Sequence, residues 1–275
     1  MRTNRVKDKI RQGKIALGAD VTTPDPWLVE AIGLAGFDAA FIDTEHTSMD
    51  FGVVENLVRA CDSVGITANI RVPSSDPAMI LRILDMGAQM ITVPHIGGKD
   101  DALRAVRAVR YPPLGERGVG TQTRGYRVAD VPLKEYIERS NAEILLAVMI
   151  EDKKAIDDVE EMASIEGLDL ITVGAHDISM ALGVPGVPSA DTTRKTMEDI
   201  ALRVKRVGKA KMSISLYHPA SGWDVKDIGK LKSMGVACFK LCPDGPARLL
   251  AAYRQQVREV REELGKHEHG PGNSV

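Results

Sequence analysis

The sequence predicts an α/β fold, a (β/α)8 TIM barrel, and three observations support that prediction. Eight short apolar runs alternate with longer amphipathic ones along the 275 residues, and strands that alternate with helices pair in parallel. Eight such units in roughly 250 residues match the size of this barrel. The rival fold, a doubly wound open sheet, needs a glycine-rich phosphate turn after its first strand, and the turn here, 20–24, contains no glycine.

The eight strands are predicted from apolar runs that end at polar or charged residues. In chain order they cover 15–19, 39–42, 67–70, 90–93, 144–150, 170–173, 211–216 and 236–241. A parallel barrel brings the carboxyl ends of all its strands to one face, and that face carries the active site in barrel enzymes. Side chains that follow these runs are therefore expected to meet in one mouth.

The helices are predicted from amphipathic stretches and their capping residues. Asp25–Pro26 and Asp76–Pro77 each read as an N-cap followed by proline in the first turn. The expected ranges are 25–36, 51–63, 76–87, 100–110, 132–140, 153–164, 192–207, 225–234 and 246–264. We expect one domain over 1–275, an extended C-terminal helix, and a flexible polar tail at 267–275.

Composition narrows the function classes. A net charge of −2 and an aromatic content of 4% give no basis for binding nucleic acid. No apolar run approaches the ~18 residues of a membrane span, and the charged segment 1–12 lacks the apolar region of a signal peptide. Three cysteines do not make a disulfide framework. We therefore expect a cytoplasmic protein that acts on a small molecule.

Four of the six histidines stand where an apolar run gives way to a polar loop, and acidic residues cluster at the same points. These histidines are His46, His95, His176 and His218; the acids are Asp43, Glu45, Glu151, Asp152 and Asp177. Glu151 and Asp177 close neighbouring strands, and two carboxylates there suit an octahedral cation that prefers oxygen. The alternative is a pair of acids that make ordinary loop hydrogen bonds or salt bridges. The pattern as a whole indicates a metal-assisted enzyme.

Two further strand-end residues are catalytic candidates. His46 follows Asp43 by three residues, and a histidine held by a carboxylate is a common general base. Arg71 ends the third strand, where a guanidinium can stabilise an oxyanion or bind a carboxylate. Each has a structural alternative: a satisfied loop histidine for His46, and a salt bridge to a neighbouring acid for Arg71.

Seven stretches, in order along the chain, resemble the HpcH/HpaI aldolase family of metal-dependent class II pyruvate aldolases. The resemblance covers roughly 15–250, and its most specific piece is the RYPPLGERGVG segment at 110–120. The other stretches are FIDTEH at 41–46, NIRVP at 69–73, LDMGA at 84–88, VP at 93–94, IE at 150–151 and GAHDIS at 174–179. The fold that the resemblance implies is the phosphoenolpyruvate/pyruvate barrel.

The resemblance implies a role for each matching residue. Glu151 and Asp177 would bind a divalent cation (Mg²⁺, Mn²⁺ or Co²⁺), His46 would accept the proton, and Arg71 would stabilise the enolate. Asp85 would raise the basicity of the histidine, with Asp43 supporting the same base, and the Gly174–Asp177 loop would offer backbone N–H groups to the substrate carboxylate. The implied reaction is the reversible cleavage of a 4-hydroxy-2-oxo acid into pyruvate and an aldehyde through a metal-bound pyruvate enolate.

Three positions depart from the family pattern. Met149 stands where members often carry a substrate-binding glutamine, His176 precedes a metal ligand, and His95 follows Pro94 in place of an apolar residue. A thioether lacks the N–H donor of an amide, so the aldehyde side of the site is expected to be unusual. Arg124, in the long connection 114–132, is a further candidate for substrate binding.

Two other functions stay open at this point. One is a relative of macrophomate synthase that forms the pyruvate enolate by decarboxylating oxaloacetate. The other is a catalytically silent barrel that binds 2-oxo acids. The resemblance also implies a homo-oligomer, a hexamer built from domain-swapped dimers through the last helix, whose apolar residues are Leu249, Leu250, Tyr253 and Val257.

Overall fold

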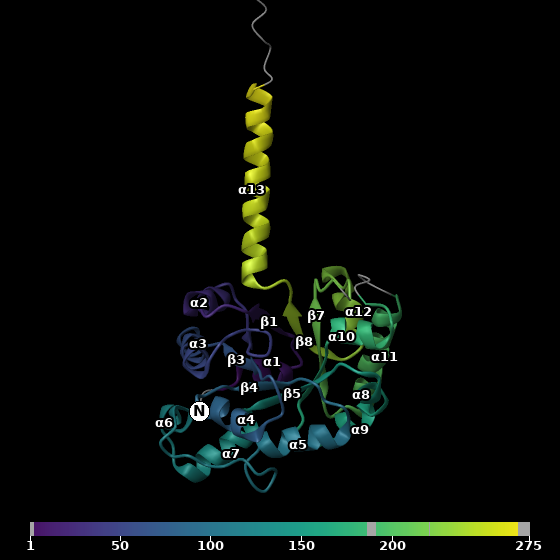
Figure 1. Ribbon diagram of the computed structural model, residues 1–275. Coiled ribbons are helices and arrows are strands. Elements are labelled where there is room, and N and C mark those ends of the chain that lie inside the picture. The colour runs from purple at the N-terminus through teal and green to yellow at the C-terminus, as the bar shows by residue number, and fades with distance from the viewer. Residues whose placement is uncertain (1–2, 186–190, 220, 269–275) are drawn as a thin grey trace, which may run out of the picture.

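Eight parallel strands close into a barrel in the order of the sequence, with helices around it, which confirms the predicted (β/α)8 fold (Figure 1). The computed structural model describes residues 3–185, 191–219 and 221–268. The strands are β1 (Ala16–Val21), β2 (Ala39–Asp43), β3 (Thr67–Arg71), β4 (Met90–Val93), β5 (Leu145–Ile150), β6 (Leu170–Val173), β7 (Lys211–Leu216) and β8 (Val236–Leu241).

The helices follow the strands in alternation, as predicted. They are α1 (Arg5–Arg11), α2 (Pro26–Leu34), α3 (Phe51–Val64), α4 (Pro77–Asp85), α5 (Lys99–Val109), α6 (Arg124–Ala129), α7 (Leu133–Glu143), α8 (Lys153–Asp157), α9 (Val159–Ala163), α10 (Ala175–Ala181), α11 (Asp191–Val207), the 3-10 helix η1 (Val225–Asp227), α12 (Ile228–Ser233) and α13 (Gly245–Glu268). Asp25 and Asp76 cap α2 and α4 by accepting hydrogen bonds from Trp27 N and Ala78 N.

Four local expectations need correction. The segment 174–177, expected as a loop, contains the first turn of α10. The helix expected over 153–164 is two short helices, α8 and α9. Part of the long connection folds as α6. The first two residues of the expected tail continue α13, and 269–275 lie outside the described residues.

The amino end of the barrel is closed by α1 and by buried charges that are paired within the protein. Arg110, whose side chain is 2% exposed, donates to the carbonyls of Gly167, Asn141 and Ile144 and forms an ion pair of 2.5 Å with Asp169. Hydrogen bonds to charged groups in such surroundings are worth roughly 1.5–3 kcal/mol each. This network holds the loops at that end in one arrangement.

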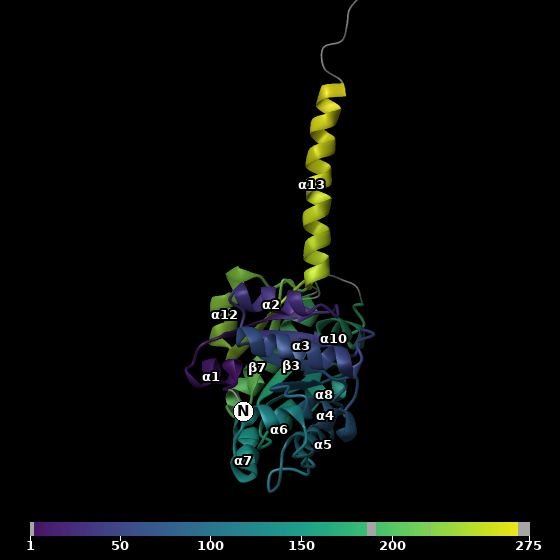
Figure 2. The same cartoon turned by 90° about the vertical axis from the view of Figure 1, so that its left-hand side faces the viewer.

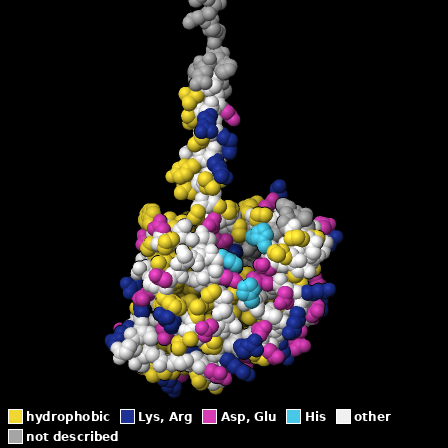
Figure 3. All heavy atoms as spheres, viewed as in Figure 1, with side chains coloured by type: hydrophobic (Ala, Val, Ile, Leu, Met, Phe, Trp, Pro, Cys, Tyr) yellow, Lys and Arg dark blue, Asp and Glu magenta, His cyan; other side chains and the backbone are white. Residues whose placement is uncertain are grey.

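The C-terminal helix α13 extends away from the barrel, beyond the end of β8 (Figures 1 and 2). Its apolar side chains recur every three or four residues and are about half exposed, and hydrophobic groups run along it in the space-filling view (Figure 3). They are Leu249, Leu250, Tyr253, Val257, Val260 and Leu264. Within the described ranges, no helix is both long enough and apolar enough to cross a membrane.

Candidate active site

A cavity of about 280 Å³ opens at the carboxyl ends of the strands, and histidines gather around a hollow on this face (Figure 3). Inward-facing side chains of β2 to β8 form its floor, because alternate residues of a barrel strand point inward. Of the site residues predicted from sequence, the cavity is lined by His46, Arg71, Met149, Gly174, His176 and Asp177.

Arg71 is held in place by Asp43, which stands opposite it in the β2–β3 register. Its Nε and Nη2 donate to the two carboxylate oxygens of Asp43 at 2.9 and 2.6 Å. Burial acts to raise the pKa of Asp43, but the hydrogen bonds and charge of Arg71 outweigh it and lower that pKa. Asp43 therefore stays ionised and fixes a guanidinium at the edge of the cavity.

His46 lies closest to a different carboxylate, Glu45. The Nε2 atom of His46 is 3.6 Å from Glu45 Oε2. Asp43 accepts a hydrogen bond from the backbone N–H of His46 and none from its imidazole. The imidazole is 67% exposed and faces the cavity. The sequence drew attention to Glu45 as a strand-end acid without assigning it a role. Its position directly before His46 was the only signal available.

Glu151 and Asp177 converge on Gly174. Glu151 Oε1 and Asp177 Oδ2 lie 2.9 and 3.1 Å from the point that a Cβ on Gly174 would occupy, so a side chain there would fill the space that the carboxylates share. Burial raises the pKa of Glu151, and the charges of Asp177 and Glu45 raise it further, against a hydrogen bond from the His95 N–H. Two carboxylates crowded in this way favour the uptake of a positive charge.

This donor set fits a cation that prefers oxygen. Among residues 3–185, 191–219 and 221–268, no group of three or more His, Cys, Asp or Glu side chains is arranged to hold a metal ion. A cation of the Mg²⁺ type commonly takes only one or two carboxylates and completes its octahedron with water and substrate. Glu151 and Asp177 are the residues that would hold it.

His95, at the end of β4, spans two of these carboxylates. Its Nε2 lies 2.6 Å from Glu45 Oε1 and its Nδ1 lies 3.0 Å from Glu151 Oε2. Its backbone N–H also donates to Glu151 Oε2, at 2.6 Å. The sequence left the role of His95 open. The structure places it between Glu45, in the loop that carries His46, and Glu151, which lies beside Asp177.

The wall formed by β7, β8 and α10 is polar. The rings of His176 and His218 are 4.4 Å apart, and Lys240 Nζ lies 3.2 Å from Asp20 Oδ1 and over the ring of Phe41. Burial, together with His176 and Lys240, lowers the pKa of His218 to about 4. His218 is therefore neutral near pH 7 and can both donate and accept hydrogen bonds.

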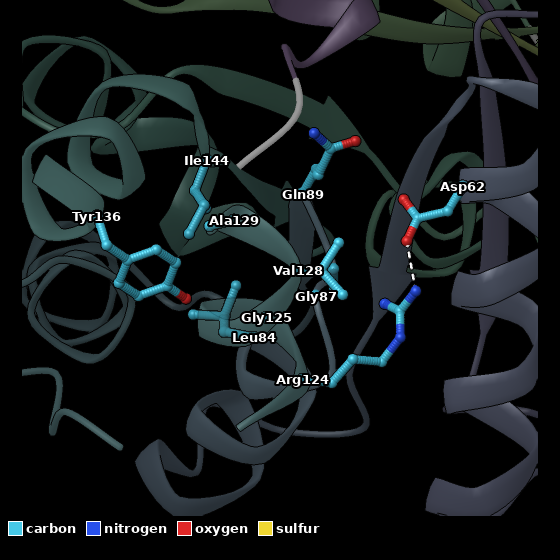
Figure 4. Close-up of a pocket in the computed structure, with 11 residues that line it drawn as sticks. Asp62, Leu84, Gly87, Gln89, Arg124, Gly125, Val128, Ala129, Tyr136 and Ile144 are labelled. Carbon is cyan, nitrogen blue, oxygen red and sulfur yellow. Dashed lines mark hydrogen bonds and ion pairs between the residues drawn. The ribbon is translucent and has the colours of Figure 1, made fainter. Parts of the chain in front are cut away.

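Four predicted residues do not line the cavity; Asp43 and Glu151 lie beside residues that do, whereas Asp85 and Arg124 have their partners elsewhere. Asp85, at the end of α4, forms an ion pair of 2.9 Å with the buried Arg117, so within one chain it is not the partner of His46. Arg124 donates to Asp62 at 2.6 Å and to the carbonyl of Met86, in a separate small pocket beside α6 (Figure 4). Both arginines hold the loop that follows α5.

A parallel barrel with carboxylates, an arginine and histidines gathered at its carboxyl mouth defines an enzyme of the barrel class. The HpcH/HpaI aldolase/citrate lyase family model matches residues 21–221. The chain belongs to this family, and it is a carbon–carbon lyase.

Named relatives agree with this assignment. A pyruvate aldolase of Rhizobium etli is 35% identical over 206 residues, which is 75% of this chain and 80% of the relative. A 5-keto-4-deoxy-D-glucarate aldolase of Citrobacter koseri is 34% identical over 206 residues, 75% and 79% of the two chains. The crystal structure of an HpcH/HpaI aldolase from Desulfitobacterium hafniense is similar over the full length of both chains, with a TM-score of 0.85 and 26% identity.

Proposed function

We propose that the protein is a divalent-metal-dependent aldolase that reversibly cleaves a 4-hydroxy-2-oxo acid into pyruvate and an aldehyde. The observation that carries this proposal is the convergence of Glu151 and Asp177 on Gly174, at the cavity that Arg71 also lines. When bound, the cation would polarise the 2-oxo group as a Lewis acid. Names of relatives, which include pyruvate and keto-deoxy-glucarate aldolases, support the same reaction class.

Arg71 supplies a fixed positive charge where negative charge develops. A guanidinium has five N–H donors, and Asp43 takes two of them. Nη1 lies 3.2 Å from Glu45 Oε2, and the donors that remain can face the oxygen of the nascent enolate. Because Asp43 already fixes the guanidinium, no reorganisation is needed during the reaction.

His46 is the residue we assign to the proton of the 4-hydroxyl group. Its imidazole is exposed at the cavity, so it can reach a substrate directly or through one water. Glu45, at 3.6 Å, is placed to stabilise the imidazolium that forms. Loss of this proton breaks the C3–C4 bond, which gives the aldehyde and leaves its electron pair on the pyruvate enolate. Backbone N–H groups of 175–177, in the first turn of α10, are the groups we assign to the pyruvate carboxylate, because the N–H of Gly174 already donates to the carbonyl of Ile150.

The polar wall favours an aldehyde that carries hydroxyl or carboxylate groups. Lys240, His218 and His176 line the same cavity as Arg71, and the ammonium retains donors beyond its contact with Asp20. We expect Lys240→Met to raise the KM for glyoxylate about tenfold in the aldol direction, the loss of one charge-assisted hydrogen bond. The KM for the neutral glycolaldehyde would stay within about twofold, and an equal rise for both aldehydes would exclude this assignment.

The central test is enolate formation. Metal-stripped protein is supplied with Mn²⁺ and pyruvate in D₂O, and exchange of the methyl protons is followed by NMR. Exchange that requires Mn²⁺ and is lost in Asp177→Asn is the expected result. Pyruvate release from oxaloacetate alone, with none from 4-hydroxy-2-oxo acids, would favour the decarboxylase alternative. Absence of both activities would leave the silent barrel as the surviving explanation.

A homo-oligomer is part of the proposal. Besides the apolar side of α13, α2 exposes Trp27 and Leu34 by 63% and 73%. A second copy that exchanges α13 would bury both sets of apolar side chains, and the hexamer of swapped dimers implied by the family resemblance is the assembly we propose. Light scattering would give its mass, and truncation after Gly245 is expected to reduce that mass.

A further inference from the structure

The backbone of His95 adopts a conformation that side chains rarely tolerate. Its φ is +54°, in the left-handed region, directly after Pro94. A residue with a Cβ is strained there, and such strain persists only where the surroundings determine the position strongly. The three contacts of His95 with Glu45 and Glu151 are those surroundings. The strain indicates that the imidazole is held for a purpose other than local stability.

We propose that His95 is a positioning residue that orients Glu151 toward the cation and links it to the loop of the catalytic base. This inference rests on the proposed function. Glu151 Oε2 faces both Nδ1 and the backbone N–H of His95, and that leaves Oε1 directed to Gly174 and Asp177. Partners of this kind fix the rotamer of a metal-binding carboxylate, and their loss typically weakens metal affinity about 10–100-fold.

The other ring nitrogen extends the same link to the base. Nε2 holds Glu45 Oε1 at 2.6 Å, while the buried Glu45 Oε2 lies 3.2 Å from Arg71 Nη1 and 3.6 Å from His46 Nε2. One imidazole thus joins the end of β5 to the loop after β2, across the end of β4. Removing it would take away a partner of Glu151 and of Glu45 Oε1 together, whereas removing His46 would leave the Glu151 contacts in place.

The left-handed backbone offers a matched set of variants. His95→Gly removes the imidazole and relieves the strain, because glycine adopts positive φ without a penalty. It also keeps the backbone N–H that donates to Glu151. His95→Asn tolerates the same backbone and retains a shorter polar side chain. His46→Ala removes the proposed base without touching Glu151.

The experiment measures Mn²⁺ affinity of the metal-stripped protein by isothermal titration, without substrate or turnover. His95→Gly is expected to raise the Kd about tenfold or more while thermal stability is retained. His95→Asn should fall between it and the wild type. His46→Ala should keep the wild-type Kd within about twofold and lose cleavage activity.

The outcomes separate the two proposals. A His95→Gly protein that binds Mn²⁺ as tightly as the wild type, where Glu151→Gln does not, overturns the role of His95 and leaves the proposed function standing. A wild-type protein that binds no Mn²⁺ overturns both. Weakened binding in His95→Gly but not in His46→Ala supports the positioning role.

Discussion

The two ends of the barrel use the same residue types in opposite ways. At the amino end, Arg110 is buried and bonded to Asp169 and to three carbonyls, and Asp38 accepts from Arg5, Lys9 and the backbone of Leu17. At the carboxyl mouth, Arg71 is bonded in a similar way to both carboxylate oxygens of Asp43.

The difference shows how to distinguish structural charges from functional ones. At the mouth, Glu151 and Asp177 crowd one space beside Gly174, and burial together with the charges of Asp177 and Glu45 raises the pKa of Glu151. A carboxylate that is buried and crowded in this way points to a ligand or a reaction. Variants at the two ends should therefore separate stability from activity.

The largest effect is expected at the mouth. Glu151→Gln should lower kcat/KM for aldol cleavage at least about 10³-fold, or roughly 4 kcal/mol, because one of the two carboxylates that we propose as cation ligands is lost. The urea midpoint should hold or rise, since burial and Asp177 disfavour the charged carboxylate in the folded protein. Steady-state kinetics and urea unfolding give both values. Activity within tenfold of the wild type would contradict the assignment.

The next effect concerns the amino end. Arg110→Ala should destabilise the fold by roughly 3–5 kcal/mol, because it breaks the ion pair with Asp169, leaving that carboxylate only Lys7 and the Leu146 N–H, and removes the donor to buried carbonyls. Arg107→Ala, at an exposed position in the last turn of α5, just before Arg110, should change stability by no more than about 0.5 kcal/mol. Urea unfolding of both variants measures the difference. A kcat per folded Arg110→Ala molecule that differs from the wild type would show that the two ends are coupled.

A smaller effect depends on pH. The pKa of His218 falls from its ordinary 6.5 to about 4 in the folded protein, through burial, His176 and Lys240. Between these values the unfolded chain binds a proton that the folded chain does not, so stability falls as the pH is lowered from 6.5 to 4. Allowing for the partial exposure of the ring, the loss is on the order of 2 kcal/mol. For His218→Asn, the free energy of unfolding, measured with urea at pH 7, 5.5 and 4.5, should fall less steeply than for the wild type. An equal fall in both proteins would contradict the assigned role of His218.

The sequence predicted the barrel well, because apolar runs and caps are local signals. β4, β6, β7 and β8 have the predicted bounds, and Asp25 and Asp76 cap their helices as expected. It missed α1, whose apolar face consists of Val6 and Ile10 alone and which is anchored by Asn4, whose side chain donates to the carbonyl of Gln89. That contact spans 85 residues and leaves no local trace.

The site was predicted less completely, because its contacts depend on register. Strand ends placed Arg71, His46, Glu151 and Asp177 at one face. The pairing of Asp43 with Arg71 depends on β2 and β3 standing in register, and the His95 bridge depends on β4 lying beside β5. Arg124 could not be located from the sequence, because its partner Asp62 belongs to a helix two strands earlier.

The projecting helix has a kinetic consequence. At about 1.5 Å per residue, the 24 residues of α13 span roughly 36 Å, and an isolated helix with one exposed apolar side has little stability in water. The barrel can therefore form in a first-order step, whereas in the oligomer we propose the ordering of α13 against a second copy would be second order in protein concentration. Refolding at increasing dilution should leave the barrel rate unchanged and slow the recovery of the full helical signal.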